Sequence, residues 1–353
     1  MRSRVRLWKR ALAALVAASV VAAYLVSSTS CAAVINASPG LRWWLFSNFG
    51  AQRVCPEMLK TSLTLRMQEG APGIGRFFPR SCNYSVNDDA QTLQVNVFGV
   101  GYGYVPPAKH VGFNLSVSVE YRPDFQIAGD DLYVWGKFSR LTGAPNFQIQ
   151  YAENPVVDVA TNVTPLGSGL NILGNQVVVG FLSRGFTVVD NSDSGKLFSL
   201  GILSPPSKPF QPYQVDDDSS YTFANEAVDV YVGSRDFLGP YEVTDSDQQL
   251  QLRMNVTGNP LEFMVVSKAT GDAWLEQYNH GQAGPPPPPG AIMGAPLNQG
   301  PTLKRLTLPP GFYYVVVDNT TTAGMVNPPV SLIPNPLFDG SSRLTYVAQL
   351  IEP

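Results

Sequence analysis

The chain has 353 residues, of which 14% are charged and 44% are hydrophobic. It carries less charge than an ordinary soluble domain, at about 25%, yet it has enough apolar residues to bury two cores of ordinary size. Five of its 24 basic residues lie within the first ten positions, and the remaining 19 face 27 acidic residues, a balance of −8. This acidic balance argues against nucleic acid as a partner.

The first thirty residues have the pattern of a signal peptide. Basic residues between Arg2 and Arg10 precede an apolar run of sixteen residues, Ala11 to Val26. A stable membrane helix needs about 20 apolar residues, so this run fits an export signal better than a permanent span. The alternative is an uncleaved signal anchor that crosses the membrane in a tilted or thinned arrangement.

The segment Ser27 to Ala33, SSTSCAA, resembles the lipobox of bacterial lipoproteins. The resemblance implies that Cys31 becomes the first mature residue and carries the lipid. Ser28 stands where the family prefers Leu, and cleavage behind Ala33 would instead release a soluble protein. Ala32 resembles the residue found after the cysteine in lipoproteins sorted to the outer membrane, which implies an anchor there, with the protein facing the periplasm or the cell surface.

Three cysteines in an exported chain leave one unpaired. If Cys31 carries a lipid, Cys55 and Cys82 remain as a pair, and an oxidising compartment favours a disulfide between them. Two alternatives stay open at this point. Both residues could be buried free thiols, or they could bind zinc with His110 and His280, although the four residues lack the spacing of zinc ligands.

Alternating apolar and polar residues predict β-strands through most of the chain, for example over 92–100, 113–121, 131–138 and 147–152. Turn residues such as those of TGAPN and TGNP punctuate the gaps. The pattern predicts an all-β protein with two β-sandwich or barrel-like domains. The only helix that we expect is a short N-terminal segment after the signal peptide, from Leu41 to Lys60, which contains several aromatic residues.

The composition changes between Ser204 and Ser220, where prolines at 205, 206, 209 and 212 precede three consecutive aspartates. Such a segment cannot build a strand ladder. We therefore expect a linker at 204–220 between an N-terminal β domain, 31–203, and a C-terminal β-sandwich, 221–353. Proline favours a semi-rigid spacer, so the two halves should be held apart or strapped side by side, and be separable. A second proline run, Gly284 to Gly290, is interpreted as a surface loop.

The C-terminal half resembles the pre-peptidase C-terminal type of β-sandwich found on secreted bacterial proteins. The resemblance covers about Asp229 to Asn319 and rests on alternating strands and on the hairpin motif LPPGFYY, which includes Pro310 to Tyr314. It implies a fold and specifies no ligand. The first half, with CPEMLK and GRFFPRSC, is similar in style to exported lipoproteins of proteobacterial type.

Few residues suggest chemistry. The sequence has no GxSxG, HExxH, CxxC or P-loop motif, so we assign no catalytic residue and no cofactor. Closely spaced acids suit calcium, which makes Asp190 and Asp193, and the triplet Asp216, Asp217 and Asp218, weak metal candidates, although plain turns explain them better. Four acids near strand ends could line a groove: Glu120, Asp124, Asp130 and Asp131.

The motif GVGYGY, Gly99 to Tyr104, has two interpretations. Its tyrosines could form a sugar-stacking surface, or its glycines could allow a tight strand bend.

These observations favour a membrane-anchored envelope lipoprotein that acts as a non-enzymatic binding or structural module for a protein or glycan partner. The alternative is a hydrolase that uses two carboxylates on an envelope or extracellular polysaccharide.

Overall fold

The computed structural model describes residues 38–106, 108–154, 177–191, 195–282, 291–326 and 340–353. Most of this part of the chain is strand, arranged in two sheets, which confirms the all-β prediction. The helices are α3 (Pro39–Leu45), η1 (Phe46–Gly50), α4 (Ala51–Met58), η3 (Val178–Leu182), η4 (Pro212–Gln214) and α6 (Lys268–Asn279). None of the described helices is long and apolar enough to cross a membrane.

The strands of the first half are β1 (Leu63–Arg66), β2 (Gly73–Asn87), β3 (Thr92–Val105), β4 (Lys109–Ala128), β5 (Asp131–Leu141), β6 (Asn146–Ala152), β7 (Phe186–Asn191) and β8 (Gly195–Leu200). Those of the second half are β9 (Ser220–Val230), β10 (Arg235–Val243), β11 (Gln249–Thr257), β12 (Leu261–Ser267), β13 (Ala291–Leu297), β14 (Gly300–Thr307), β15 (Gly311–Asp318) and β16 (Ser342–Ile351).

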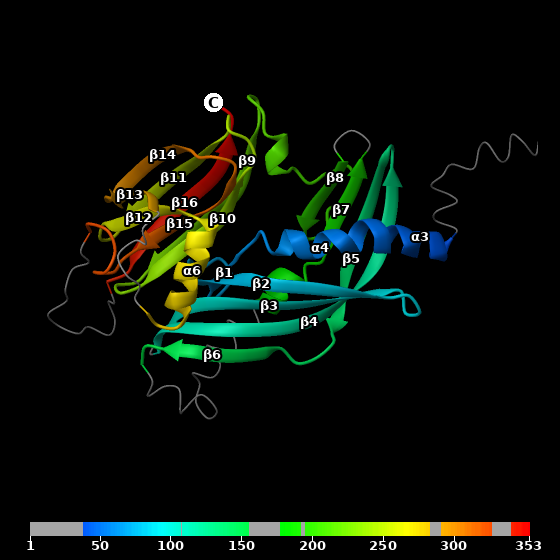
Figure 1. Ribbon diagram of the computed structural model, residues 1–353, viewed down its shortest axis with the longest axis horizontal. Helices are drawn as coiled ribbons and strands as arrows, with labels where there is room; N and C mark the ends of the chain where they lie inside the picture. Colours follow the sequence, from blue (N-terminus) through cyan, green and yellow to red (C-terminus); the bar gives the residue numbers. More distant parts are fainter. Residues whose placement is uncertain (1–37, 107, 155–176, 192–194, 283–290, 327–339) are drawn as a thin grey trace, which may run out of the picture.

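The larger sheet runs through both halves in the order β14-β11-β16-β9-β2-β3-β4-β5-β7-β8, with β1 beside β2 and β6 beside β4. The smaller sheet has the order β10-β15-β12-β13 and packs against the β14 to β9 part of the larger one (Figure 1). The two halves meet in the large sheet at a single parallel pair, Gly73 with Val228. The sheet is therefore continuous in topology but narrow at the junction.

The N-terminal helical segment was predicted over Leu41 to Lys60, and α3, η1 and α4 confirm it. Ser38 caps α3, because its Oγ accepts from the Leu41 backbone N at 3.4 Å, and Pro39 pre-sets the first turn. Phe46 and Met58 pack in one core with alternate residues of β3 and β4. A disulfide joins Cys55 to Cys82 with 5.2 Å between the Cα atoms, so α4 is covalently attached to β2.

This bond confirms the predicted pair and removes the two alternatives for these cysteines. A zinc site formed by Cys55, Cys82, His110 and His280 is wrong, because both thiols are consumed in the disulfide. The two buried free thiols are excluded for the same reason.

The sequence analysis expected no helix beyond the N-terminal segment, and so it missed the short elements η3 and η4 and the longer helix α6. Helix α6 follows β12 and is capped by Ser267, whose Oγ accepts from the Thr270 backbone N at 3.3 Å. Trp274, Leu275 and Tyr278 share its buried face. They cover the outer side of β15, which explains why β15 is buried on both faces.

The glycines of Gly99 to Tyr104 serve close packing. A Cβ on Gly99 would lie 2.4 Å from Phe77 Cζ, and one on Gly101 would lie 2.4 Å from Phe113 Cζ. Tyr102 and Tyr104 are buried at 2% and 6% exposure. The interpretation of this motif as a sugar-stacking surface is therefore wrong, and the glycines within β3 instead make room for the rings of neighbouring strands.

The proline-rich segment contains no strand before its last residue, Ser220, where β9 begins. It is strapped along the first half, since Lys208 Nζ lies 2.6 Å from Asp131 Oδ2 and Gln211 Nε2 donates to the Phe198 carbonyl at 2.6 Å. Its other end is held by Gln248, which donates to the Pro212 carbonyl at 3.0 Å. The second proline run, Gly284 to Gly290, lies outside the described residues.

The two halves also share a buried core. Phe78 and Tyr102 from the first half pack with Phe237, Trp274 and Tyr314 from the second. Ring contacts connect all five side chains. Between ring centroids, Phe78 lies 5.7 Å from Tyr314, and Phe237 lies 6.3 Å from Tyr314, 6.0 Å from Tyr102 and 5.6 Å from Trp274. The separability of 31–203 and 221–353 stays a prediction, but this core changes what we expect when the linker is cut.

We predict that cutting the linker leaves the halves associated. A specific protease site placed between the exposed residues Asp217 and Asp218 should be cleaved, and the two fragments should then elute together in size-exclusion chromatography. The reason is that the apolar area shared between the halves stays buried without a backbone connection. The fragments should separate in denaturant, since the disulfide lies wholly in the first fragment. Two folded fragments that elute apart under native conditions would instead establish separable domains.

Candidate functional site at the junction of the two halves

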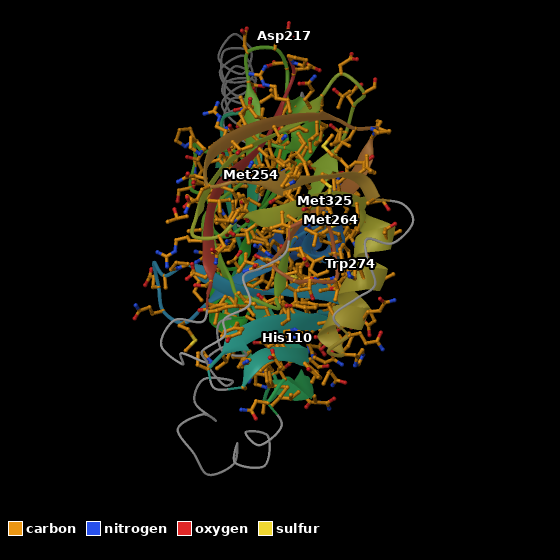
Figure 2. The ribbon with its side chains drawn as sticks, turned by 90° about the vertical axis from the view of Figure 1, so that its left-hand side faces the viewer. His110, Asp217, Met254, Met264, Trp274 and Met325 are labelled. Atoms are coloured by element: carbon orange, nitrogen blue, oxygen red, sulfur yellow. A yellow bond between two sulfur atoms is a disulfide. The ribbon has the colours of Figure 1, made fainter. Side chains whose placement is uncertain are left out.

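The residues singled out in the sequence do not gather into one site. Cys31 lies outside the described residues. His110 is buried and stacks on Tyr278 with 4.1 Å between ring centroids, whereas His280 is exposed, 3.2 Å from Glu276 Oε1. Figure 2 shows His110 within the strands of the first half, far from the labelled Asp217.

The calcium candidates lie in two separate places. Asp190 is near the end of β7, where it pairs in register with Lys196, and Asp193 lies outside the described residues. Asp216, Asp217 and Asp218 are exposed in a turn at one end of the molecule (Figure 2). In the part of the chain that the structure describes, no three His, Cys, Asp or Glu side chains are placed to hold a metal ion together.

The four strand-end acids are engaged in separate ion pairs or exposed. Glu120 accepts from Arg140 at 3.0 Å, and this hydrogen bond lowers the pKa of Glu120. Asp124 contacts Arg42 and Lys137 at 3.2 and 2.6 Å, and Asp131 contacts Lys208 at 2.6 Å. Asp130 is exposed in the β4 to β5 turn. They do not line a common groove.

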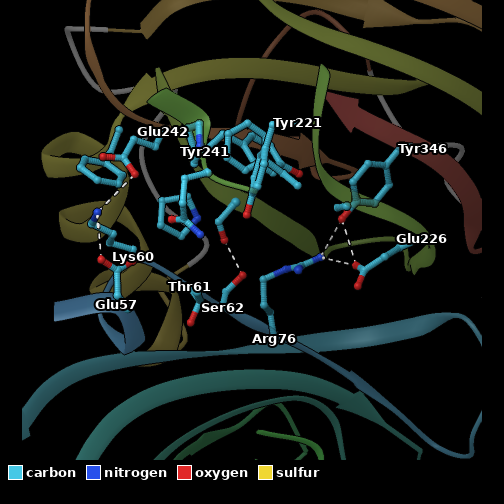
Figure 3. A pocket seen from close by; sticks show the side chains of 17 residues that line it. Glu57, Lys60, Thr61, Ser62, Arg76, Tyr221, Glu226, Tyr241, Glu242 and Tyr346 are labelled. Atoms are coloured by element: carbon cyan, nitrogen blue, oxygen red, sulfur yellow. Dashed lines mark hydrogen bonds and ion pairs between the residues drawn. The ribbon is translucent and has the colours of Figure 1, made fainter. Parts of the chain in front are cut away.

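A cleft instead opens where the two halves meet, and we call it the junction cleft. Its inner cavity, of about 200 Å³, lies between the segment Lys60 to Ser62 with Arg76 on one side and β9, Tyr241 and Tyr346 on the other (Figure 3). Its outer cavity, of about 500 Å³, lies between β8, β9 and the linker residues Pro209 to Gln211. The cavities share lining residues: Glu57, Thr61, Gln211 and Tyr221. The cleft therefore exists only where the halves and the strapped linker come together.

The floor of the inner cavity is held by Arg76, whose side chain is 4% exposed. Its Nε and Nη2 each lie 3.2 Å from an oxygen of Asp236 on β10, a bidentate pair that joins the two halves. Nη1 donates to Thr64 Oγ1 at 2.7 Å, and Nη2 lies 3.7 Å from Glu226 Oε2. Tyr102 donates to Asp236 at 2.5 Å and so completes its partners.

These contacts fix the charges of the floor. Burial alone would lower the pKa of Arg76, but Asp236 and Glu226 outweigh it and keep the guanidinium charged. Burial raises the intrinsic pKa of Glu226, yet Arg76, the Thr64 hydroxyl and Arg66 lower it overall, so this carboxylate stays ionised. Burial raises the pKa of Tyr346, whose hydroxyl donates to Glu226 at 3.0 Å.

The rim of the inner cavity mixes charge with aromatic rings. Lys60 Nζ lies 3.6 Å from Glu57 and 3.4 Å from Glu242, and it is 5.9 Å from the centre of the Phe312 ring. Ser62 donates to the Gly239 carbonyl across the junction, as Figure 3 shows. The rim therefore offers hydrogen-bond acceptors and ring faces to a ligand. Its charged groups are paired with one another.

The sequence analysis missed every residue of this floor. Arg76 and Tyr346 are 270 positions apart, and Thr64 and Glu226 are 162 apart. No local motif records such a contact. A weak signal was present in GRFFPR, where a basic residue interrupts an otherwise apolar strand and so needs a buried partner.

Comparisons with known proteins give no family. No family model and no curated protein matches the sequence. Procruciferin, an 11S globulin from Brassica napus, is 10% identical over 84% of this chain and 86% of that chain, with a TM-score of 0.17. An oxalate decarboxylase is 9% identical over 83% and 77%, with a TM-score of 0.15. Likeness at this level carries no argument about fold or function.

We predict a pH dependence of stability that comes from His110. Burial, with the nearby Arg235, lowers the pKa of His110 to about 3, whereas an unfolded histidine titrates near ~6.5. Below pH ~6.5 the histidine takes up a proton in the unfolded chain but stays neutral in the folded one. The stability that is present at neutral pH is therefore lost as the pH falls toward 3. As the pH falls from 7 to 5, this residue should lower the free energy of unfolding by about 2 kcal/mol.

The variant His110→Phe keeps a ring on Tyr278 and removes the titration. Urea unfolding at pH 7 and pH 5 should show a smaller loss of stability in this variant than in the wild type. The exposed His280→Gln serves as the control and should keep the wild-type difference. Equal losses in His110→Phe and the wild type would contradict the assignment.

Proposed function

We propose that the chain is an exported envelope lipoprotein, attached to a membrane through a lipid on Cys31, that acts as a non-enzymatic binding module for a protein or glycan partner. The junction cleft is the observation that supports this proposal most. Taken together, its two cavities have a volume within the range of small-ligand sites, ~300 to 1,000 Å³. Their lining combines aromatic rings with a few fixed polar groups. Such a rigid concave surface binds without needing a nucleophile.

Two features support the location. The Cys55 to Cys82 disulfide suits an oxidising compartment outside the cytoplasm. The basic and apolar leader with SSTSCAA supports export and lipid attachment, and Ala32 supports the outer membrane, with the protein facing the periplasm or the cell surface.

The carboxylate hydrolase is the weaker candidate. A glycosidase acid needs a raised pKa so that it can donate a proton. Glu226, the carboxylate at the floor of the cleft, has a lowered pKa. Burial does raise the pKa of Asp318, but this residue is fully buried beside Arg235, with 2.9 Å between Oδ1 and Nε, and does not line the cleft. The other two carboxylates that line the cleft, Glu57 and Glu242, are paired with Lys60, so the cleft favours binding over hydrolysis.

We predict that Cys31 carries the lipid. Mass spectrometry of the protein from its native envelope should find an acylated N-terminal Cys31, and Cys31→Ser should yield uncleaved precursor or soluble protein. The variant Cys55→Ser is the control, because it removes a cysteine without touching the lipobox and should leave the protein acylated. A mature N-terminus beyond Cys31 would refute the anchor.

We predict that filling the inner cavity abolishes partner binding. Ala224→Trp places an indole among the lining residues of that cavity, whereas Ala90→Trp adds the same group at an exposed turn and is the control. The mature protein should retain its envelope protein or glycan partner in the control and lose it in Ala224→Trp. Release of reducing sugar that depends on Glu226 would instead favour the hydrolase.

A further inference from the structure

A row of aromatic rings connects the two cavities of the junction cleft. Phe210 of the linker stacks on Tyr221 at 6.3 Å between centroids, Tyr221 contacts Phe223 at 4.8 Å, and Phe223 contacts Tyr241 at 5.3 Å. Phe210 is 40% exposed, and Tyr221 and Phe223 are half-buried, so parts of these rings face the cleft. The row offers apolar platforms at successive positions from the outer cavity to the inner one.

Polar groups accompany the rings. Thr61 and Glu57 line both cavities, and Glu242 lines the inner one. Carboxylates and hydroxyls accept hydrogen bonds from hydroxyl groups, while ring faces pack against C–H groups. A pyranose sugar presents both kinds of group on one small ring, so the lining matches its chemistry.

The charges of the lining select against an anionic ligand. The three cations that line the cleft each contact a carboxylate: Lys60 with Glu57 and Glu242, Arg76 with Asp236, and Lys208 with Asp131. An acidic polymer would have to break these pairs to reach a positive charge. The excess of acidic residues in the chain adds a repulsion of the same sign.

The edge of the large sheet beside the cleft disfavours an extended peptide as the ligand. Strand β8 ends the large sheet and could accept a further strand through its free edge. The Gln211 side chain already binds the Phe198 carbonyl on β8, and the linker runs beside it. Peptide addition along β8 would have to displace this strap.

We infer that the junction cleft binds a linear, uncharged glycan, whose sugar rings pack on Phe210 and Tyr221 and whose hydroxyls bond to the carboxylates of the rim. This inference rests on the proposed binding function and names its ligand class. The linker forms one wall of the site, so the strap that joins the halves is also part of the binding surface.

The test uses the mature full-length protein and titration calorimetry with defined probes. The neutral probes are cellohexaose, maltohexaose, chitohexaose and a dextran oligosaccharide, the acidic probes are alginate and polygalacturonate hexamers, and an extended uncharged decapeptide is the third class. At least one neutral probe should bind. Phe210→Ala should weaken it about tenfold, as expected for loss of one stacked ring, and Phe210→Tyr should restore it.

Tyr84→Ala is the matched control, because Tyr84 is 37% exposed on β2 and lines neither cavity of the cleft. It should leave binding unchanged. Tighter binding of an acidic probe, binding that is insensitive to Phe210→Ala, or no binding of any neutral probe at millimolar concentration would overturn the inference. Binding of the decapeptide alone, lost in Phe210→Ala, would also overturn it while leaving the proposed binding function in place.

Discussion

The burial of one ion pair, Arg76 with Asp236, determines how the two halves sit together. Removing either charge from water costs several kcal/mol, and that cost is offset only when both partners are present with their hydrogen bonds satisfied. Arg76 comes from β2 and Asp236 from β10, so neither half can meet this requirement alone. Thr64 and Tyr102 complete the set of partners. The floor of the junction cleft is thus formed by the contact that docks the halves.

Strand periodicity made the all-β fold predictable, because the residues that face a core recur at every second position. In β16 the buried residues Leu344, Tyr346, Ala348 and Leu350 follow this rule. Cysteine counting gave the right disulfide for a comparable reason, since only one pair remains once Cys31 is set aside. Both signals are local in sequence or depend on counting alone.

The features that sequence reasoning missed depend on tertiary contacts. Helix α6 is only twelve residues long and contains Gly271, which lowers helix propensity. The reason for that glycine lies elsewhere in the chain, since a Cβ there would lie 2.2 Å from Tyr314 Cδ2. The cleft is a stronger case, because Arg76, Glu226 and Tyr346 become neighbours only after β2, β9 and β16 have been placed. Charged residues that pair over such long sequence separations have no fixed spacing that a sequence pattern could detect.

The position of β16 bears on when the protein can fold. This strand, the last that the structure describes, lies in the interior of the large sheet, with β11 on one side and β9 on the other. Until it arrives, β9 lacks the neighbour with which it pairs over its whole length. A chain that emerges from its N-terminus would therefore keep its second half open until β16 has emerged. For a protein proposed to be threaded through a membrane translocon, this order of assembly delays the formation of a folded obstacle during transport.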